Sequence, residues 1–338
     1  MLVNVFRMLF IVAGGALLPV TSFAAGLCCQ LSSGVQESMS GVAAPSTDQF
    51  SLQFTYSLTR MDKLKQGSET RSLDQAAATT PYTSLPVTMD MVKYTTTIGY
   101  GFSPDLKAFV AIPYLRNTMD MTMSLGVGMG WMDMSMEPVS GLGDITLMGL
   151  YRIYRDREIR PTEAVTVGFG LKTPTGSNTE ISDTGSLVHA HMQPGTGSWD
   201  PLVSLIYTKM AGSILYQADG TYQYTTKSRE GYEFGDSLAL NLSGKYAVVK
   251  EFNVTAGLTY LHGGKASDSD GQYTDLTSLM DDPANTGGNS LWFSPGIQAL
   301  PIRNGVIDLK VQVPVWERVN GIQLVSSYRL LLGLSYGF

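Results

Sequence analysis

Charged residues are scarce in this chain, at 15% of 338 residues, and they leave a formal net charge of -6. No basic stripe accompanies that charge, which excludes nucleic acid as a partner. Long hydrophobic runs are missing too, because the apolar stretch of residues 8–18 is short for a membrane helix and no later segment offers a helical span. A membrane protein built of helices is therefore not expected.

Cysteine occurs only at Cys28 and Cys29. Adjacent cysteines bridge each other only through a strained ring, so we interpret them as N-terminal thiols that occasionally pair between molecules, with a redox or metal role as the alternative. Leu27 is not the small residue that a lipoprotein site requires before its cysteine.

Catalytic motifs are also missing. Neither G-x-S-x-G nor H-E-x-x-H occurs, and the glycine-rich residues 126–130 lack the strand-to-helix setting of a phosphate loop. A barrel phospholipase would need a serine and a histidine together in the wall, whereas His189 and His191 lie in an expected loop and His262 lies near a strand end. We predict that the chain is not an enzyme and has no cofactor.

What the sequence does contain is strict two-residue alternation, and it is clearest in residues 322–338. One face carries Leu324, Tyr328, Leu330, Leu332, Leu334, Tyr336 and Phe338, and the other carries Ser327, Arg329, Gly333, Ser335 and Gly337. An apolar face suits lipid and a polar face suits a wet lumen. A terminal strand that ends on phenylalanine is typical of bacterial outer-membrane β-barrels, and we expect the barrel-assembly machinery to recognise it.

Similar alternation predicts twelve strands, at residues 49–60, 89–102, 105–117, 142–155, 162–172, 199–210, 212–225, 234–248, 250–263, 289–300, 304–316 and 322–338. Most of the connections alternate between short turns and long loops, as they do in outer-membrane barrels, which also require an even strand count. The predicted fold class is therefore all-β: a transmembrane antiparallel β-barrel of about 12 strands with short periplasmic turns and long outer loops. A soluble β-sandwich is the alternative, although its strands are usually shorter.

The N-terminus predicts how such a barrel is exported. Arg7, the apolar residues 8–18 and the small-x-small pattern at residues 22–24 indicate a signal peptide over residues 1–24 that is cleaved after Ala24. Residues 25–48 then form either a periplasmic segment or a plug, and residues 49–338 form the barrel. We expect the protein in the Gram-negative outer membrane, surrounded by outer-membrane lipid.

Three motifs resemble a known family. Residues 141–144 read G-L-G-D before an alternating strand, residues 170–176 read G-L-K-T-P-T-G, and residues 195–200 read G-T-G-S-W-D. In this order they resemble the outer-membrane transporters labelled as phenol-degradation (MetA-pathway) proteins, over roughly residues 49–338. The resemblance implies a 12-strand barrel for uptake or efflux of small, often aromatic or apolar molecules, and it implies no catalytic residue.

The candidate pore lining lies on the last two strands. Asp308, Lys310 and Gln312 share the polar face of residues 304–316, and Arg329 lies on the polar face of the following strand. Neighbouring opposite charges form a polar eyelet that orients or screens a solute. We predict a passive channel for a small solute, and we expect this solute to be an aromatic or apolar molecule.

Methionine is concentrated in residues 118–141, which are expected to form an outer loop. The candidate ligands there are Met119, Met121, Met123, Met129, Met132, Met134 and Met136, and the next long loop adds His189 and His191. Thioethers select soft metals such as Cu(I) and silver, and M-x-M spacing on an extended chain places successive sulfurs on one side. A flexible apolar loop around a promiscuous mouth is the plainer interpretation. The alternative function is therefore a barrel that handles soft metal, or a sheath for a periplasmic partner.

Overall fold

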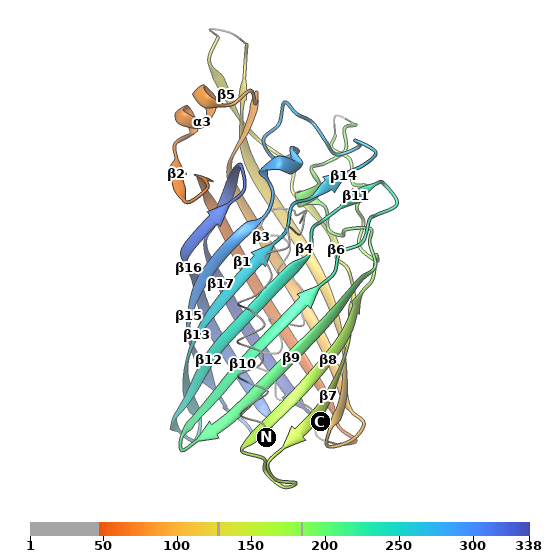
Figure 1. The fold of residues 1–338 in the computed structure, drawn as a ribbon, viewed down its shortest axis with the longest axis vertical. Helices are drawn as coiled ribbons and strands as arrows, with labels where there is room; N and C mark the ends of the chain where they lie inside the picture. Colours follow the sequence, from red (N-terminus) through yellow and green to blue (C-terminus); the bar gives the residue numbers. More distant parts are fainter. Residues whose placement is uncertain (1–46, 127–128, 184) are drawn as a thin grey trace, which may run out of the picture.

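The computed structural model describes residues 47–126, 129–183 and 185–338, which form one closed antiparallel β-barrel (Figure 1). The expected signal peptide, both cysteines and almost all of residues 25–48 lie outside the described residues. None of the helices in the described ranges is both long and apolar enough to cross a membrane.

Twelve strands make up the wall, and each overlaps one of the twelve predicted segments. They are β1 (Phe50–Gln66), β3 (Ser84–Gly101), β4 (Leu106–Ser124), β7 (Thr146–Arg155), β8 (Glu163–Lys172), β9 (Asp200–Ala211), β10 (Ile214–Gln223), β12 (Ser237–Val249), β13 (Phe252–Gly263), β15 (Gly288–Ala299), β16 (Gly305–Val319) and β17 (Ile322–Gly337). Each strand pairs with the next one along the chain, which confirms the meander that the connections predicted.

Alternation along each strand separates a wet interior from an apolar exterior. On β1 the inward residues are Ser51, Gln53, Thr55, Ser57 and Thr59, all of which are buried. Their outward neighbours Phe50, Leu52 and Phe54 are 42–54% exposed, and outward apolar side chains continue around the other strands. Such a band is stable only against lipid, because a soluble monomer rarely exposes so continuous an apolar surface.

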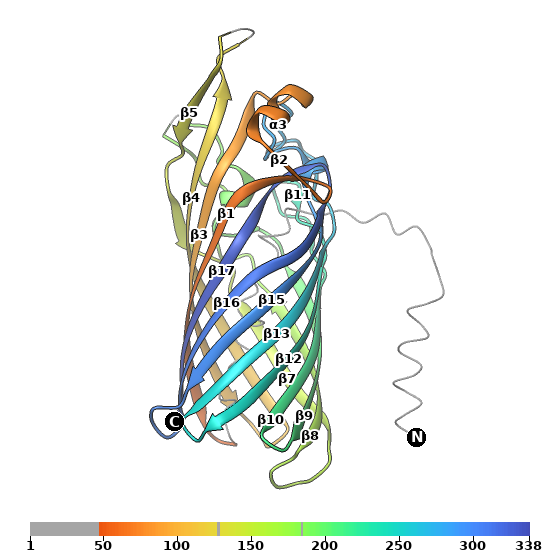
Figure 2. The same ribbon diagram turned by 90° about the vertical axis from the view of Figure 1, so that its left-hand side faces the viewer.

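The two ends of the barrel differ (Figure 2). At one end, tight turns join successive strands. The first residue of β1 and the last residues of the chain also lie at this end, where the Phe338 amide donates to the Phe50 carbonyl at 2.9 Å. At the opposite end, long connections carry β2 (Glu69–Arg71), α3 (Leu73–Thr79), β5 (Trp131–Ser135), β6 (Val139–Leu142), η1 (Ala190–Met192), β11 (Tyr232–Glu233), β14 (Ser267–Asp268) and η2 (Pro283–Asn285). By the pattern of outer-membrane barrels, the first end faces the periplasm and the second faces outward.

The wall closes where β17 meets β1. Fifteen residue pairs connect these two strands, whereas only eight connect β17 with its neighbour β16, from Gly305 opposite Tyr336 to Gln312 opposite Arg329. Beyond Gln312 the outer part of β16 pairs with β15, and the outer part of β17 pairs with β1 across two register shifts near Met61. The outer end of β17 is consequently buried from Ile322 to Ser326.

The segment expected as a simple loop at residues 118–141 is a two-stranded ribbon instead. Strand β4 continues through Ser124 and pairs with β5, and the ribbon projects beyond the rest of the barrel (Figure 2). Methionine is not a typical strand residue, so strand propensity did not predict that backbone pairing would continue here.

Candidate functional site

The lumen contains a cavity of about 110 Å³ between β10, β12, β13, β15, β16 and β17. Polar side chains from alternating positions form most of its wall, and Leu261, Trp292 and Leu331 add an apolar part. A site of this kind holds a small molecule through apolar contact and orients it with a few polar groups.

Three cations line this cavity: Lys245, Lys310 and Arg329. Lys310 Nζ lies 3.1 Å from Asp308 Oδ2, while Lys245 Nζ donates to the neutral Gln298 Oε1 at 3.3 Å. Asp219 is the only carboxylate in the described cavity lining. The lining is therefore more positive than the chain as a whole.

Arg329 is held in a fixed position on β17. Its Nε donates to Thr59 Oγ1 at 3.0 Å, its Nη1 donates to Gln312 Oε1 at 3.4 Å, and its guanidinium lies 5.3 Å from the centre of the Trp292 ring. A guanidinium that is fixed by hydrogen bonds and ring stacking loses little entropy when an anion or an aromatic solute contacts it.

The structure brings the four predicted lumen residues together. Arg329, Lys310 and Gln312 line the cavity, and Asp308 pairs with Lys310. Lys245, Asp219 and Trp292 also line the cavity and were not predicted from the sequence. Their convergence depends on how the wall closes, and that information is not local.

A second cluster of charges lies near the outer rim, and it joins the three sequence motifs. Lys172 Nζ is 3.3 Å from Asp144 Oδ2 and 2.5 Å from Asp200 Oδ2, with side-chain exposures of 10%, 5% and 0% respectively. Asp144 also accepts from the backbone N–H groups of Gly176 at 3.0 Å and Thr196 at 2.9 Å. One residue of each motif thus takes part in a single buried ionic cluster.

Two glycines in these motifs are required by the close approach of their backbones. A Cβ on Gly195 would lie 2.4 Å from the Gly176 carbonyl carbon, and a Cβ on Gly176 would lie 2.8 Å from the Gly195 Cα. No larger side chain fits at either position without moving the chain. The motifs therefore encode a close approach of two segments within the single connection between β8 and β9.

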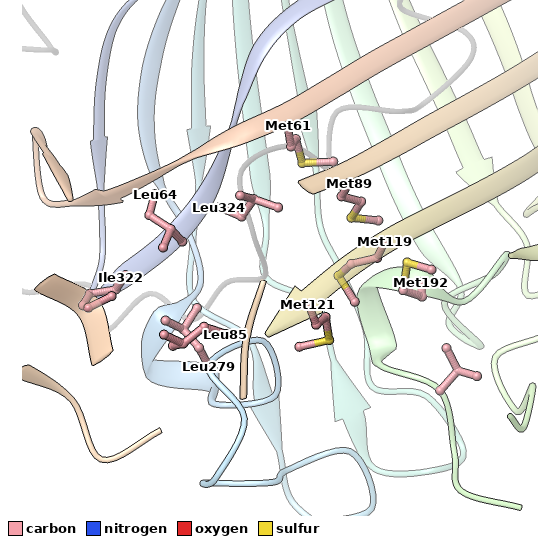
Figure 3. Packing of buried hydrophobic residues seen from close by; sticks show 12 residues of the cluster. Met61, Leu64, Leu85, Met89, Met119, Met121, Met192, Leu279, Ile322 and Leu324 are labelled. Carbon is pink, nitrogen blue, oxygen red and sulfur yellow. The ribbon is translucent and has the colours of Figure 1, made fainter. Parts of the chain in front are cut away.

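A hydrophobic cluster packs the outer loops onto the ends of the strands. Its buried members are Met61, Leu64, Ala76, Leu85, Met89, Met119, Met121, Val188, Met192, Leu279, Ile322 and Leu324, and we call it the mouth cluster. Figure 3 shows Met61, Met89 and Met119 on adjacent strands and Met192 facing them from its loop. Flexible thioethers suit a contact between so many irregular segments.

The predicted metal ligands lie in different surroundings. Met119 and Met121 are buried in the mouth cluster, Met136 packs against it, and Met123, Met129, Met132 and Met134 are 38–68% exposed. His189 Nδ1 lies 2.6 Å from Asp281 Oδ1, and His191 is buried beside the Phe234 ring. Within the described residues, no three His, Cys, Asp or Glu side chains are grouped as metal ligands.

The family model described as "Putative MetA-pathway of phenol degradation" matches residues 70–324, which is more than half of the chain. The chain belongs to this family. The resemblance carried by the three motifs is thus confirmed, and the ionic cluster is what those motifs build in this member of the family. No curated protein sequence matches the chain.

Comparison with solved structures finds similar barrels. An outer membrane channel from Pseudomonas putida F1 matches with a TM-score of 0.58 and 16% identity, over 87% of this chain and 97% of that chain. The toluene transporter TodX from Pseudomonas putida matches with a TM-score of 0.42 and 12% identity, over 94% and 95%. The first match shows the fold of this chain, which is that of an outer-membrane β-barrel.

Proposed function

We propose that the protein is a passive channel for a small solute with an aromatic or apolar body. The observation that carries this proposal is the lumen cavity of about 110 Å³, in which Trp292, Leu261 and Leu331 lie beside fixed cations. A passive route follows from the lack of an energy source in the sequence. Membership of a family described by phenol degradation supports an aromatic solute.

We also propose that the chain has no catalytic activity. Each histidine is engaged in a structural contact: His189 with Asp281, His191 with Phe234, and His262 Nδ1 with Asn289 Oδ1 at 2.9 Å. A Ser–His or Cys–His mechanism needs its histidine within hydrogen-bond reach of the nucleophile.

Export and assembly complete the proposal. Residues 1–24 act as a cleaved signal peptide, and residues 25–48 form a periplasmic segment or a plug. The barrel-assembly machinery recognises β17, which closes the wall against β1 and ends near the exposed Phe338.

Ion selectivity in a planar bilayer tests the role of the lumen. Because the cavity lining carries three cations and one carboxylate, the purified protein should prefer anions, and Arg329→Glu should shift the reversal potential toward cation selectivity. Arg157→Glu is the matched control. It makes the same change of charge, but Arg157 lies in a periplasmic turn and its side chain is 66% exposed. Identical reversal potentials for the wild type and Arg329→Glu would refute the proposed pore lining.

Solute uptake by proteoliposomes tests the cargo. Phenol and benzoate should enter faster than glucose, and Trp292→Ala should reduce the difference by removing the aromatic contact beside Arg329. Equal rates for all three solutes would contradict the proposal of an aromatic solute, but they would not contradict the proposal that the protein is a channel.

A further inference from the structure

Six methionines lie on one face of the ribbon formed by β4 and β5. In its register Met121 faces Met134 and Met123 faces Met132. The Met136 amide donates to the Met119 carbonyl at 2.9 Å, which continues the same register by one more pair. Three facing methionine pairs therefore follow one another along the ribbon, and we call them the methionine array.

The spacing of the array suits a ligand that bridges thioethers. Directly opposed residues in an antiparallel pair have Cβ atoms about 5 Å apart, and the next pair on the same face is about 7 Å further along. Methionine side chains with three rotatable bonds can easily close these gaps around one ion. The row also continues inward, because Met119 faces Met89 on β3 and Met89 faces Met61 on β1.

Packing explains only the inner part of this array. Met119 and Met121 are 2% and 3% exposed within the mouth cluster, whereas Met123, Met132 and Met134 are 38%, 51% and 38% exposed. An exposed strand is usually built from Val, Ile or Thr, which favour extended backbone more than methionine does. The outer methionines thus contribute little to burial, and their shared property is the sulfur atom.

The charges of the ribbon favour a cation. Residues 118–141 contain Asp120, Asp133 and Glu137 and no Lys, Arg or His. Asp120 lies opposite Ser135, and Asp133 lies opposite Thr122, so both carboxylates lie on the face of the ribbon that is opposite the methionine pairs. The negative charge of the ribbon attracts a positive ion, and the methionine face itself offers that ion neutral soft ligands.

We propose that the methionine array binds a soft monovalent cation, Cu(I) or Ag(I), through facing pairs of thioethers at the outer mouth. Thioether sulfur prefers such ions over Ca²⁺, Mg²⁺ and Zn²⁺, which take oxygen, nitrogen or thiolate ligands. The exposed Met123, Met132 and Met134 form the entry to the array, and the row through Met119 to Met61 lies beyond it.

Silver titration of the full-length barrel tests this inference, because Ag(I) has the same soft character as Cu(I) and needs no reductant. Thiolates bind silver more tightly than thioethers do, so every variant carries Cys28→Ser and Cys29→Ser. Calorimetry should detect silver binding, and the triple replacement of Met123, Met132 and Met134 by leucine should weaken it by at least about tenfold. Leucine keeps the volume and apolar character of these exposed side chains, so the fold should be retained.

Met210→Leu is the matched control, because Met210 is 44% exposed on β9 near a periplasmic turn and lies outside the array. It should leave silver binding unchanged. A wild-type barrel that binds no silver, or a triple variant weakened by less than about threefold, would overturn the inference. Ion selectivity in the bilayer is a separate measurement, so neither result of the silver titration decides whether the protein is a channel.

Discussion

The buried ionic cluster at the outer rim allows a sharp prediction about stability. Lys172→Met removes the cation that lies between Asp144 and Asp200 but keeps most of the length and apolar volume of the side chain. Both carboxylates are almost completely buried, at 5% and 0% exposure. Removing one partner of a buried ion pair leaves uncompensated charge, so we expect a loss of about 3–5 kcal/mol in the free energy of unfolding.

The measurement is urea unfolding of the purified barrel in lipid vesicles, followed by tryptophan fluorescence. Lys209→Met is the matched control, since Lys209 Nζ lies 3.1 Å from Glu163 Oε2 but the two side chains are 50% and 32% exposed. We expect its unfolding curve to overlay that of the wild type, because exposed ion pairs contribute little.

A double variant separates the charge from the packing. Asp200→Asn combined with Lys172→Met removes one of the two stranded charges, so part of the lost stability should return. If Lys172→Met destabilised the barrel no more than Lys209→Met does, or if Asp200→Asn gave no rescue, the ionic explanation of this cluster would be wrong.

Three further predictions concern the outer loops. Burial, partly offset by Asp281, lowers the pKa of His191 from 6.5 to about 4. The folded state thus favours the neutral imidazole. This preference contributes about 3 kcal/mol to the free energy of unfolding above pH 6.5, and the contribution is lost as the pH falls from 6.5 through about 4. Protease cleavage of the outer loops should therefore increase as the pH falls from 6.5 to about 4. A cleavage rate that does not change with pH would contradict a buried, neutral His191. Leu279→Ala, in the mouth cluster, should cost about 2–5 kcal/mol and raise single-channel conductance by loosening the loop that carries it, whereas unchanged conductance would show that this loop does not restrict the pore. Gly195→Ala should lower the urea midpoint by the equivalent of about 1–3 kcal/mol through its clash with Gly176, and an unchanged midpoint would show that these two segments of the loop can separate without cost.

The wall could be predicted because each strand carries its own evidence. Polar and apolar residues alternate along β13 and β17 whatever the strand pairs with, so periodicity located these strands to within two residues. The family motifs were also visible, but their contacts were not. Lys172 and Asp200 become neighbours through the pairing of β8 with β9, and Asp144 joins them by accepting from the N–H groups of Gly176 and Thr196 in the connection between those strands.

The candidate sites depend more strongly on tertiary structure. Lys245 and Arg329 are 84 positions apart in the sequence and share a cavity only because the sheet closes. The methionines were visible as a cluster, but their arrangement in facing pairs depends on the register of β4 and β5, which no local pattern encodes. Sequence reasoning also grouped His189 and His191 with the methionines, whereas the Asp281 and Phe234 contacts give each histidine a different environment.

The seam between β1 and β17 has a consequence for biogenesis. The strand that is translated after all the others is held by almost twice as many residue pairs to the first strand as to its immediate neighbour. Until it arrives, β1 presents an open row of unpaired N–H and C=O groups, which is a template for aggregation. A contact between such distant parts of a chain also forms slowly, because a long loop must close first. The nascent polypeptide must therefore be kept apart from other copies during its passage to the membrane, and a protein truncated before β17 would have two reactive edges instead of a finished wall.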